Sequence, residues 1–199
     1  MNPTVENSTA EITITPSEKH QTIEGFGASA AWWAQDVGGW EDEKRTRIVK
    51  LLFNKDEGIG LTIYRYNIGG GIANNIQDPW RTAETFEVSP GVYDWTRDAN
   101  AIWVMKAAQA EGVDQFVAFV NSPPARMTVS GFTTGEKDGK SNLPPEMYAD
   151  FAQYLVDVVR HLRDEEGIPI GWISPVNEPQ WAWSYKNAQE GSHYGPVEV

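Results

Sequence analysis

The stretch Phe116-Val-Ala-Phe-Val120 is an almost uninterrupted apolar run of the length of one strand. Such a run is typical of a parallel strand that is covered on both faces. Residues 98–111, just before it, carry apolar side chains at helical spacing, and Gly112 ends that pattern. This stretch therefore predicts a helix that leads into a buried strand.

The same alternation continues on both sides of this pair. Upstream, the patterns predict a first core strand ending near Ala28, a helix over 41–53 and a strand over 61–68. Downstream, they predict a helix over 145–163 and a strand over 172–176. Strands that alternate with helices indicate parallel β/α units with right-handed crossovers. No Gly-x-Gly-x-x-Gly motif follows the first strand, which disfavours a nucleotide-binding fold.

The amino-terminal segment has a different pattern. Glu11–Thr15 alternates with the period of a strand, Pro16 begins a turn, and extended character resumes at Gln21. We therefore expect a β-hairpin in an extended segment of residues 1–22, ahead of the β/α units. Met1–Ala10 is polar and has no apolar segment of the kind found in a signal peptide. The sequence does not indicate the cellular compartment.

The composition narrows the classes of partner. With 28 acidic against 16 basic residues, the formal net charge is −12, so phosphate backbones and anionic lipid surfaces are poor partners. No stretch approaches the roughly 20 apolar residues of a membrane span. The chain has no cysteine and therefore no disulfide or thiolate nucleophile, and its three histidines lack metal-ligand spacing. We expect no metal, no cofactor, no nucleic acid and no membrane partner.

Aromatic side chains make up 12% of the residues, including nine tryptophans. Planar side chains of this kind stack on sugar rings, which indicates a carbohydrate ligand. The alternative is that most of these rings pack in the core.

Polar and aromatic residues gather where each predicted strand ends, at 28–33, 65–71, 121–127 and 177–181. In a β/α barrel, the carboxyl ends of the strands carry the working residues. Glu178 ends an apolar strand, and a carboxyl group half enclosed by apolar walls would have a raised pKa, which suits a general acid. The alternative is a solvated carboxylate in an exposed loop.

Four stretches together resemble glycoside hydrolase family 30, within the large clan of barrel hydrolases that place Asn-Glu at the end of the fourth strand. They are Ile23-Glu-Gly-Phe-Gly-Ala-Ser-Ala-Ala-Trp-Trp33, Gly60-Leu-Thr-Ile-Tyr-Arg-Tyr-Asn-Ile-Gly-Gly-Gly71, Asn121-Ser-Pro-Pro-Ala-Arg-Met-Thr-Val-Ser-Gly131 and Trp172-Ile-Ser-Pro-Val-Asn-Glu-Pro-Gln-Trp181. The resemblance implies an α/β fold of the (β/α)8 TIM-barrel type, with residues 23–199 as its first four β/α units. Residues 1–22 would join a side β-domain.

The resemblance also implies roles for individual residues. Glu178 would protonate the leaving glycosidic oxygen and later deprotonate the attacking water, as the acid/base of a retaining glycosidase. Asn177 would bind the sugar 2-hydroxyl, and Arg65 would hold the nucleophile ionised. The residues expected to contact the sugar are Trp32, Trp33, Asn121, Trp181, Trp183 and Arg126, with at least one of the first two tryptophans packing in the core. Arg126 departs from the family, where tryptophan usually follows Pro-Pro-Ala.

Half of the expected barrel is missing. A full barrel takes about 250 residues, and the family places its nucleophile at the end of the seventh strand. Because a retaining glycosidase needs a second carboxylate about 5–5.5 Å from the first, we expect the chain alone to be incomplete and inactive. The half-barrel would expose two unpaired edges, which a missing half or a second copy would cover.

The resemblance favours β-1,6-galactan as the substrate, with glucuronoxylan, β-1,6-glucan and glucosylceramide as alternatives. Two other hypotheses remain open at this stage. The chain could be a truncated, non-catalytic fragment that binds carbohydrate through its aromatic walls, or a folding unit without a ligand.

Overall fold

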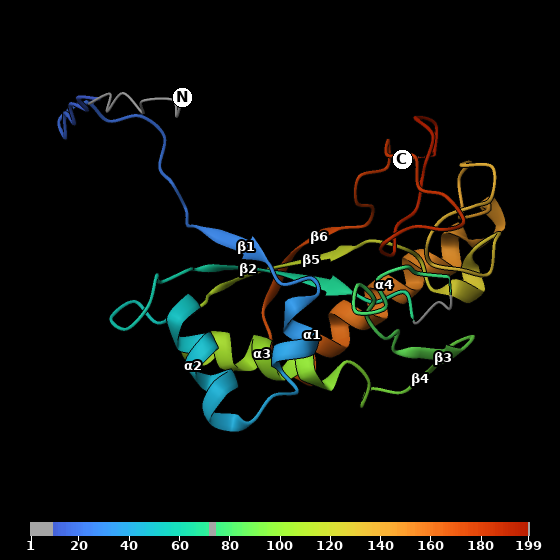
Figure 1. Cartoon of the computed structure of the whole chain (residues 1–199), viewed down its shortest axis with the longest axis horizontal. Helices are drawn as coiled ribbons and strands as arrows, with labels where there is room; N and C mark the ends of the chain where they lie inside the picture. The colour runs from blue at the N-terminus through green and yellow to red at the C-terminus, as the bar shows by residue number, and fades with distance from the viewer. Residues whose placement is uncertain (1–9, 72–74, 199) are drawn as a thin grey trace, which may run out of the picture.

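The computed structural model describes residues 10–71 and 75–198. Its centre is a parallel sheet of four strands in the order β1-β2-β5-β6, so strands that follow one another in the chain are neighbours in space (Figure 1). These strands are β1 (Gly27–Ser29), β2 (Ile63–Ile68), β5 (Gln115–Val120) and β6 (Ile170–Ser174). The α-helices are α1 (Trp33–Val37), α2 (Asp42–Phe53), α3 (Ala99–Ala110) and α4 (Tyr148–Asp164). The predicted parallel α/β layout is confirmed.

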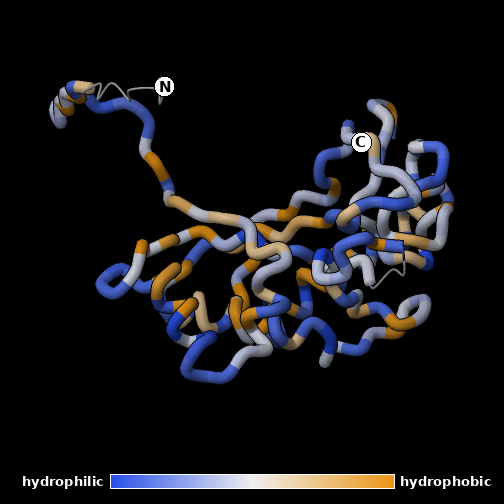
Figure 2. Tube along the Cα trace, viewed as in Figure 1, coloured by the Kyte–Doolittle hydropathy of each residue, from blue (hydrophilic) through white to orange (hydrophobic). Residues whose placement is uncertain are grey.

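All four helices lie against one face of the sheet (Figure 1). Figure 2 shows that hydrophobic residues run along the strands and the helices beneath them. The residues that face the helices alternate along the two central strands, and they are Tyr64, Tyr66, Ile68, Phe116, Ala118 and Val120. Because side chains alternate across a strand, Arg65, Asn67 and Phe119 lie on the opposite face. That face and the carboxyl ends of the strands form the candidate site.

Helix α4 shows why the helix over 145–163 could be predicted. Its buried residues are Phe151, Tyr154, Leu155, Val158 and Leu162, which form one stripe at helical spacing. Pro144 and Pro145 precede it, and the chain enters through the short 3-10 helix η2 (Pro145–Met147). A second 3-10 helix, η1 (Ala125–Met127), follows β5.

A short helix and a short pair of strands were not predicted. Helix α1 has only five residues, too few to display helical periodicity. The antiparallel pair of β3 (Glu87–Ser89) and β4 (Val92–Tyr93) is equally short, and Gly91 supplies the positive φ of 70° in its turn. Both elements lie close to the carboxyl ends of the parallel strands, where the sequence pattern is irregular.

The predicted amino-terminal hairpin is wrong for the part of the segment that the structure describes. Residues 10–26 contain no strand, although a turn does form at 16–18. Ile12 and Ile14 are 82% and 81% exposed. A period-two pattern becomes a strand only where another strand completes its hydrogen bonds, and none does so here. Residues 1–9 lie outside the described residues.

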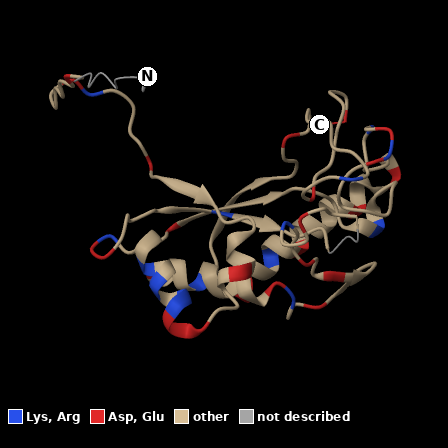
Figure 3. Cartoon of the chain, in the orientation of Figure 1, with Lys and Arg blue, Asp and Glu red and all other residues tan. Residues whose placement is uncertain are grey.

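Charged residues lie mainly on the helices and loops (Figure 3). Within the four strands of the parallel sheet, all of them described, Arg65 is the only charged residue. None of the helices in residues 10–71 and 75–198 is both long enough and apolar enough to cross a bilayer.

A buried acid, Asp98, stands at the start of α3 in the left-handed region, with φ of 50°. The hydroxyl group of Tyr66 donates a hydrogen bond to its Oδ2 over 2.7 Å. Burial raises the pKa of Asp98 from 3.8 to about 8, against the opposing effect of the Tyr66 hydrogen bond. The folded protein therefore holds a proton here that the unfolded chain gives up at much lower pH.

We predict that Asp98 makes the folded state less stable as the pH rises. Its contribution is complete below the unfolded pKa of 3.8 and is lost between that value and about 8. One proton corresponds to a slope of at most about 1.4 kcal/mol per pH unit. Asp98→Asn, which tolerates a positive φ and imitates the protonated acid, should remove that slope from chemical unfolding curves. The exposed Asp114→Asn is the control, and an unchanged slope in Asp98→Asn would contradict the assignment.

Candidate active site

A row of polar side chains crosses the carboxyl ends of three neighbouring strands. Arg65 Nη2 donates to Asn177 Oδ1 over 2.8 Å, and Asn177 Nδ2 donates to Asn121 Oδ1 over 2.9 Å. Asn121 Nδ2 donates to Asn67 Oδ1 over 3.1 Å, and Asn67 Nδ2 donates to Glu190 Oε1 over 2.6 Å. We call Asn177, Asn121 and Asn67 the amide row. It joins a guanidinium to a carboxyl group through three amides.

The parallel sheet brings these residues together. Asn67 lies in β2, while Asn121 and Asn177 follow β5 and β6. Parallel strands in register bring their carboxyl ends to one edge of the sheet. Three of the predicted site residues, Arg65, Asn121 and Asn177, therefore meet in one network. Arg65 and Asn177 are 112 positions apart in the chain, and Asn121 and Asn177 are 56 apart.

Two neighbours hold the guanidinium of Arg65, the ring of Phe119 and the side chain of Asn177. Its Cζ lies 3.3 Å from the centroid of the Phe119 ring, in cation–π contact on the face away from the helices. Burial lowers the pKa of Arg65 from its ordinary value of 12.5, and the negative charge of Glu178 opposes that shift. Glu178 therefore lies within electrostatic reach of the guanidinium.

Glu178 has a backbone that few glutamates adopt. Its φ is 47°, in the left-handed region, which is disfavoured for residues other than glycine, asparagine and aspartate. Its carbonyl oxygen accepts hydrogen bonds from the Trp181 N–H over 3.0 Å and from Trp183 Nε1 over 3.1 Å. Strain of this kind persists where the surroundings impose it, and it collects at functional sites.

The expected apolar enclosure of Glu178 is wrong for this structure, because the residue is exposed. The physical reason is the position of β6 at the edge of the sheet. In the described part of the chain β6 pairs only with β5, so no strand lies on its other side.

Glu190 was missed by sequence reasoning. It is fully buried, at 0% exposed, and Asn67 and Trp32 both donate to its Oε1. Burial raises the pKa of Glu190 from 4.5 to about 7, and these two hydrogen bonds oppose the shift. A glutamate in a loop is usually solvated, and no periodic pattern around position 190 distinguishes this one.

The four predicted sugar-stacking tryptophans have different environments. Trp183 is 3% exposed and offers no free ring face, against its expected platform role, whereas Trp32, at 8% exposed, agrees with the expectation that at least one of Trp32 and Trp33 packs in the core. Trp32 Nε1 bonds Glu190 over 3.1 Å, and the Trp183 ring packs against Gly191, where a Cβ would approach it to 2.3 Å. Trp33 is half-buried against the core and donates to the Ser29 carbonyl, which also favours a packing role.

Trp181 remains a candidate platform, at 58% exposed. Trp80, which was not predicted, is 59% exposed, and its ring meets Trp32 edge-on at 6.4 Å between centroids. Tyr185, also not predicted, is 36% exposed. Trp80 lies in a long loop with no recognisable pattern around it, so only the structure places it beside Trp32.

Arg126 is engaged by another side chain. Its Nε donates to Glu87 Oε2 over 2.8 Å, and Glu87 Oε1 accepts the N–H of Gly91. Glu87 is buried, whereas the Arg126 side chain is 27% exposed. This ion pair ties the loop after β5 to the turn between β3 and β4. It gives Arg126 a structural contact that the sequence did not indicate.

The described residues hold no group of three or more His, Cys, Asp or Glu side chains that could bind a metal ion. What the arrangement offers instead is proton and hydrogen-bond chemistry. An exposed carboxylate, a fixed cation and an oriented amide stand together on one edge of the sheet.

Comparison with known proteins gives a consistent family. The family model described as O-Glycosyl hydrolase family 30 matches residues 9–199. The endo-beta-1,6-galactanase of Hypocrea rufa is 28% identical over 211 residues, which covers 92% of this chain and 43% of the galactanase.

Two solved structures extend the likeness to the fold. A conserved exported protein from Bacteroides fragilis is 35% identical with a TM-score of 0.86, over 93% of this chain and 40% of that one. A glycoside hydrolase family 30 subfamily 8 xylanase from Clostridium acetobutylicum is 26% identical with a TM-score of 0.65, over 92% and 38%. The chain thus spans less than half the length of each of these proteins.

The left-handed backbone at Glu178 leads to a prediction about stability. Glycine has no Cβ to strain at this φ, so Glu178→Gly should be more stable than Glu178→Ala by about 1 kcal/mol. At Thr46, exposed within α2, the order should reverse, because glycine destabilises a helix by about 1 kcal/mol relative to alanine. Urea unfolding of the four variants tests both pairs. An alanine variant at position 178 as stable as the glycine variant would rule out the strain.

Proposed function

The chain belongs to glycosyl hydrolase family 30, and from this premise we propose that it provides the acid/base side of a retaining glycosidase active site. Glu178 is the acid/base carboxylate in this proposal. The observation that carries it is the meeting of Arg65, Asn177 and the exposed Glu178 at one sheet edge, with the Glu178 charge acting on the guanidinium.

The proposed chemistry has two steps. Glu178 first donates its proton to the leaving glycosidic oxygen while a second carboxylate attacks the anomeric carbon and forms a glycosyl-enzyme intermediate. The Glu178 carboxylate then takes a proton from water, which attacks the same carbon and releases the sugar with its original configuration. A carboxylate that is exposed to the sugar can perform both transfers.

Asn177 fits the role of a sugar ligand. Its amide nitrogen has two hydrogens, and one of them goes to Asn121. The other can donate to the sugar 2-hydroxyl, a contact that strengthens in the transition state. Its Oδ1 is already engaged by Arg65, so the amide cannot turn over without losing that bond.

Arg65 would act on the second carboxylate. A fixed cation lowers the pKa of a neighbouring carboxyl group and keeps it ionised for attack. The ring of Phe119 and the oxygen of Asn177 hold the guanidinium in one position, so its positive charge acts from a fixed place.

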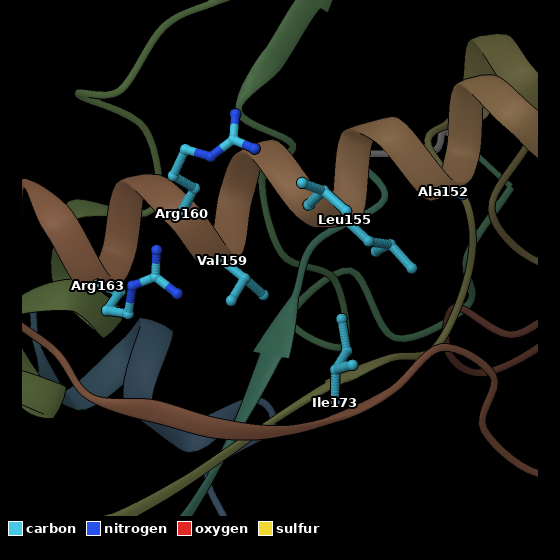
Figure 4. Close-up of a pocket in the computed structure, with 7 residues that line it drawn as sticks. Ala152, Leu155, Val159, Arg160, Arg163 and Ile173 are labelled. Carbon is cyan, nitrogen blue, oxygen red and sulfur yellow. The ribbon is translucent and has the colours of Figure 1, made fainter.

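We propose that further β/α units complete the sheet into a (β/α)8 barrel, of which these four units form half. The second carboxylate would come from those further units. β1 and β6 each pair with one strand only in the described residues, and Trp172 and Ile173 of β6 are 52% and 43% exposed. An apolar groove of about 380 Å³ lies between α4 and β6, where Leu155 and Val159 face Ile173 (Figure 4). A further β/α unit, or a second copy of the chain, would cover this surface.

For the substrate we propose β-1,6-galactan, because a β-1,6-galactanase is among the relatives. Xylan is the next candidate, since a family 30 xylanase is 26% identical to this chain. β-1,6-Glucan and glucosylceramide rank behind both. A purely carbohydrate-binding fragment is less favoured, because stacking on aromatic rings requires neither a strained glutamate nor a cation beside it.

We expect Glu178→Gln to lower kcat on β-1,6-galactan by about 10²–10⁴-fold, because the amide cannot transfer the proton. The assay uses the protein made from its whole reading frame, and thermal unfolding checks that folding is preserved. Glu165→Gln, an exposed glutamate after α4, is the control and should retain full activity. Wild-type turnover in Glu178→Gln would dismiss the proposal.

The platform role of Trp181 can be tested separately. We expect Trp181→Ala to raise KM for galacto-oligosaccharides by about 2- to 10-fold with kcat little changed, since ring stacking acts on ground state and transition state alike. Trp181→Phe should restore most of the loss. Trp40→Ala, a half-exposed tryptophan on the helix side of the sheet, is the matched control. A KM unaffected by Trp181→Ala would remove this residue from the site.

A further inference from the structure

Glu190 is a buried carboxyl group for which the proposed reaction has no use. It follows a loop that leaves β6, and its backbone N–H bonds the Arg81 carbonyl across the molecule. Its Oε1 accepts two hydrogen bonds, from Asn67 Nδ2 over 2.6 Å and from Trp32 Nε1 over 3.1 Å. Its Oε2 is buried without a hydrogen-bond partner in the described part of the chain. Burying an acid with one oxygen unpaired costs free energy, so this position calls for an explanation.

Glu190 terminates the amide row, and the row has a direction. An arginine can only donate hydrogen bonds, so the Asn177 atom beside Arg65 must be its oxygen. The Asn177 nitrogen therefore faces Asn121, whose oxygen must accept, and the same step repeats at Asn67. The row can end only on an acceptor, and it ends on Glu190. Hydrogen bonds aligned in this way polarise one another.

A carboxylate suits this end better than any neutral group. An amide side chain can turn over and exchange its donor for its acceptor, whereas an ionised carboxylate only accepts. The positive charge of Arg65 at one end and the negative charge of Glu190 at the other thus select a single orientation of all three amides. That orientation leaves the second Nδ2 hydrogen of Asn177 available for a ligand.

We propose that Glu190 is a positioning residue for the glycosidase: as a carboxylate it fixes the amide row and, through it, the donor that Asn177 presents to the sugar 2-hydroxyl. This inference rests on the proposed function. Glu190 acts on the donor of Asn177 through Asn67 and Asn121.

The same oxygen also supports the aromatic side of the site. Through its bond to Trp32 Nε1, Glu190 holds the indole whose edge meets the exposed Trp80 ring at an interplanar angle of 89°. Glu190 therefore links the polar row at the strand ends with an exposed tryptophan that the sequence did not predict. Loss of its charge would loosen both.

Burial raises the pKa of Glu190 to about 7. Above that pH the carboxylate ends the row as described, and below it the acid is neutral and holds Asn67 more weakly. Two charged residues lie near it on neighbouring segments. Arg81 provides the carbonyl that binds its backbone, and Asp98 at the start of α3 interacts with it electrostatically. Ionisation of Asp98 at higher pH would oppose that of Glu190.

The first test observes the row without catalysis. In NMR spectra of the protein made from its whole reading frame, the side-chain amide signals of Asn67, Asn121 and Asn177 should shift together with a midpoint near pH 7. Glu190→Gln should abolish that common titration. Asp98→Asn, which removes another buried acid outside the row, should preserve it. Amide signals of Glu190→Gln that match those of the wild type at pH 9 would overturn the proposal.

The second test measures kinetics on the same variants. Glu190→Gln should lower kcat on β-1,6-galactan by about 10-fold and leave KM nearly unchanged, because the 2-hydroxyl contact acts mainly in the transition state. It should also remove a fall in kcat below pH 7. Asp98→Asn should leave kcat and KM unchanged. Glu190→Asp should recover part of the kcat that Glu190→Gln loses. A purely structural role would lower thermal stability alone, and that outcome would also overturn the proposal.

The two proposals can fail independently. If Glu178→Gln remains active, the glycosidase assignment fails whatever Glu190 does. If Glu178→Gln is inactive but the amide signals ignore the charge of Glu190, only the positioning role is lost. Should Glu190→Gln not fold, the wild-type NMR titration still decides whether the row senses this carboxyl group.

Discussion

The arrangement depends on one cation placed in a sheet that otherwise has no charge. Arg65 lies over the Phe119 ring and can only donate hydrogen bonds, so the oxygen of Asn177 must turn toward it. The orientation of Asn177 sets that of Asn121 and then that of Asn67. The row ends on a buried carboxyl group. A neutral residue at position 65 would leave the carboxylate of Glu190 as the one charged group that orients these amides. The polar order of the strand ends thus begins at one guanidinium and is completed by the carboxyl group at the other end of the row.

Much of the fold follows from periodicity. The strands at 63–68 and 115–120 and the helices at 42–53 and 148–164 lie within a few residues of the predicted spans, because each buries a regular stripe or run. Glu11–Thr15 has the period of a strand but remains without one, since pattern alone cannot provide a partner strand. Periodicity thus predicts elements well where the chain itself completes their packing.

The site divides in a similar way. The meeting of Arg65, Asn121 and Asn177 could be predicted, because the carboxyl ends of parallel strands lie at one edge of the sheet. Glu190 could not, since nothing local separates a buried loop glutamate from a solvated one. The role of Trp32 could not be predicted either, because a tryptophan that packs inward and one that faces a sugar look alike in sequence. Their roles depend on contacts made across more than a hundred residues.

We propose that Glu178 faces a second carboxylate across a gap that holds the sugar. A crystal structure of the protein made from its whole reading frame tests it most directly, through the distance between the two carboxyl groups. The account predicts a carboxylate about 5–5.5 Å from Glu178 and within hydrogen-bond reach of Arg65. A separation of about 6.5–9.5 Å would indicate inversion instead of retention. The absence of any carboxylate opposite Glu178 would contradict the account altogether.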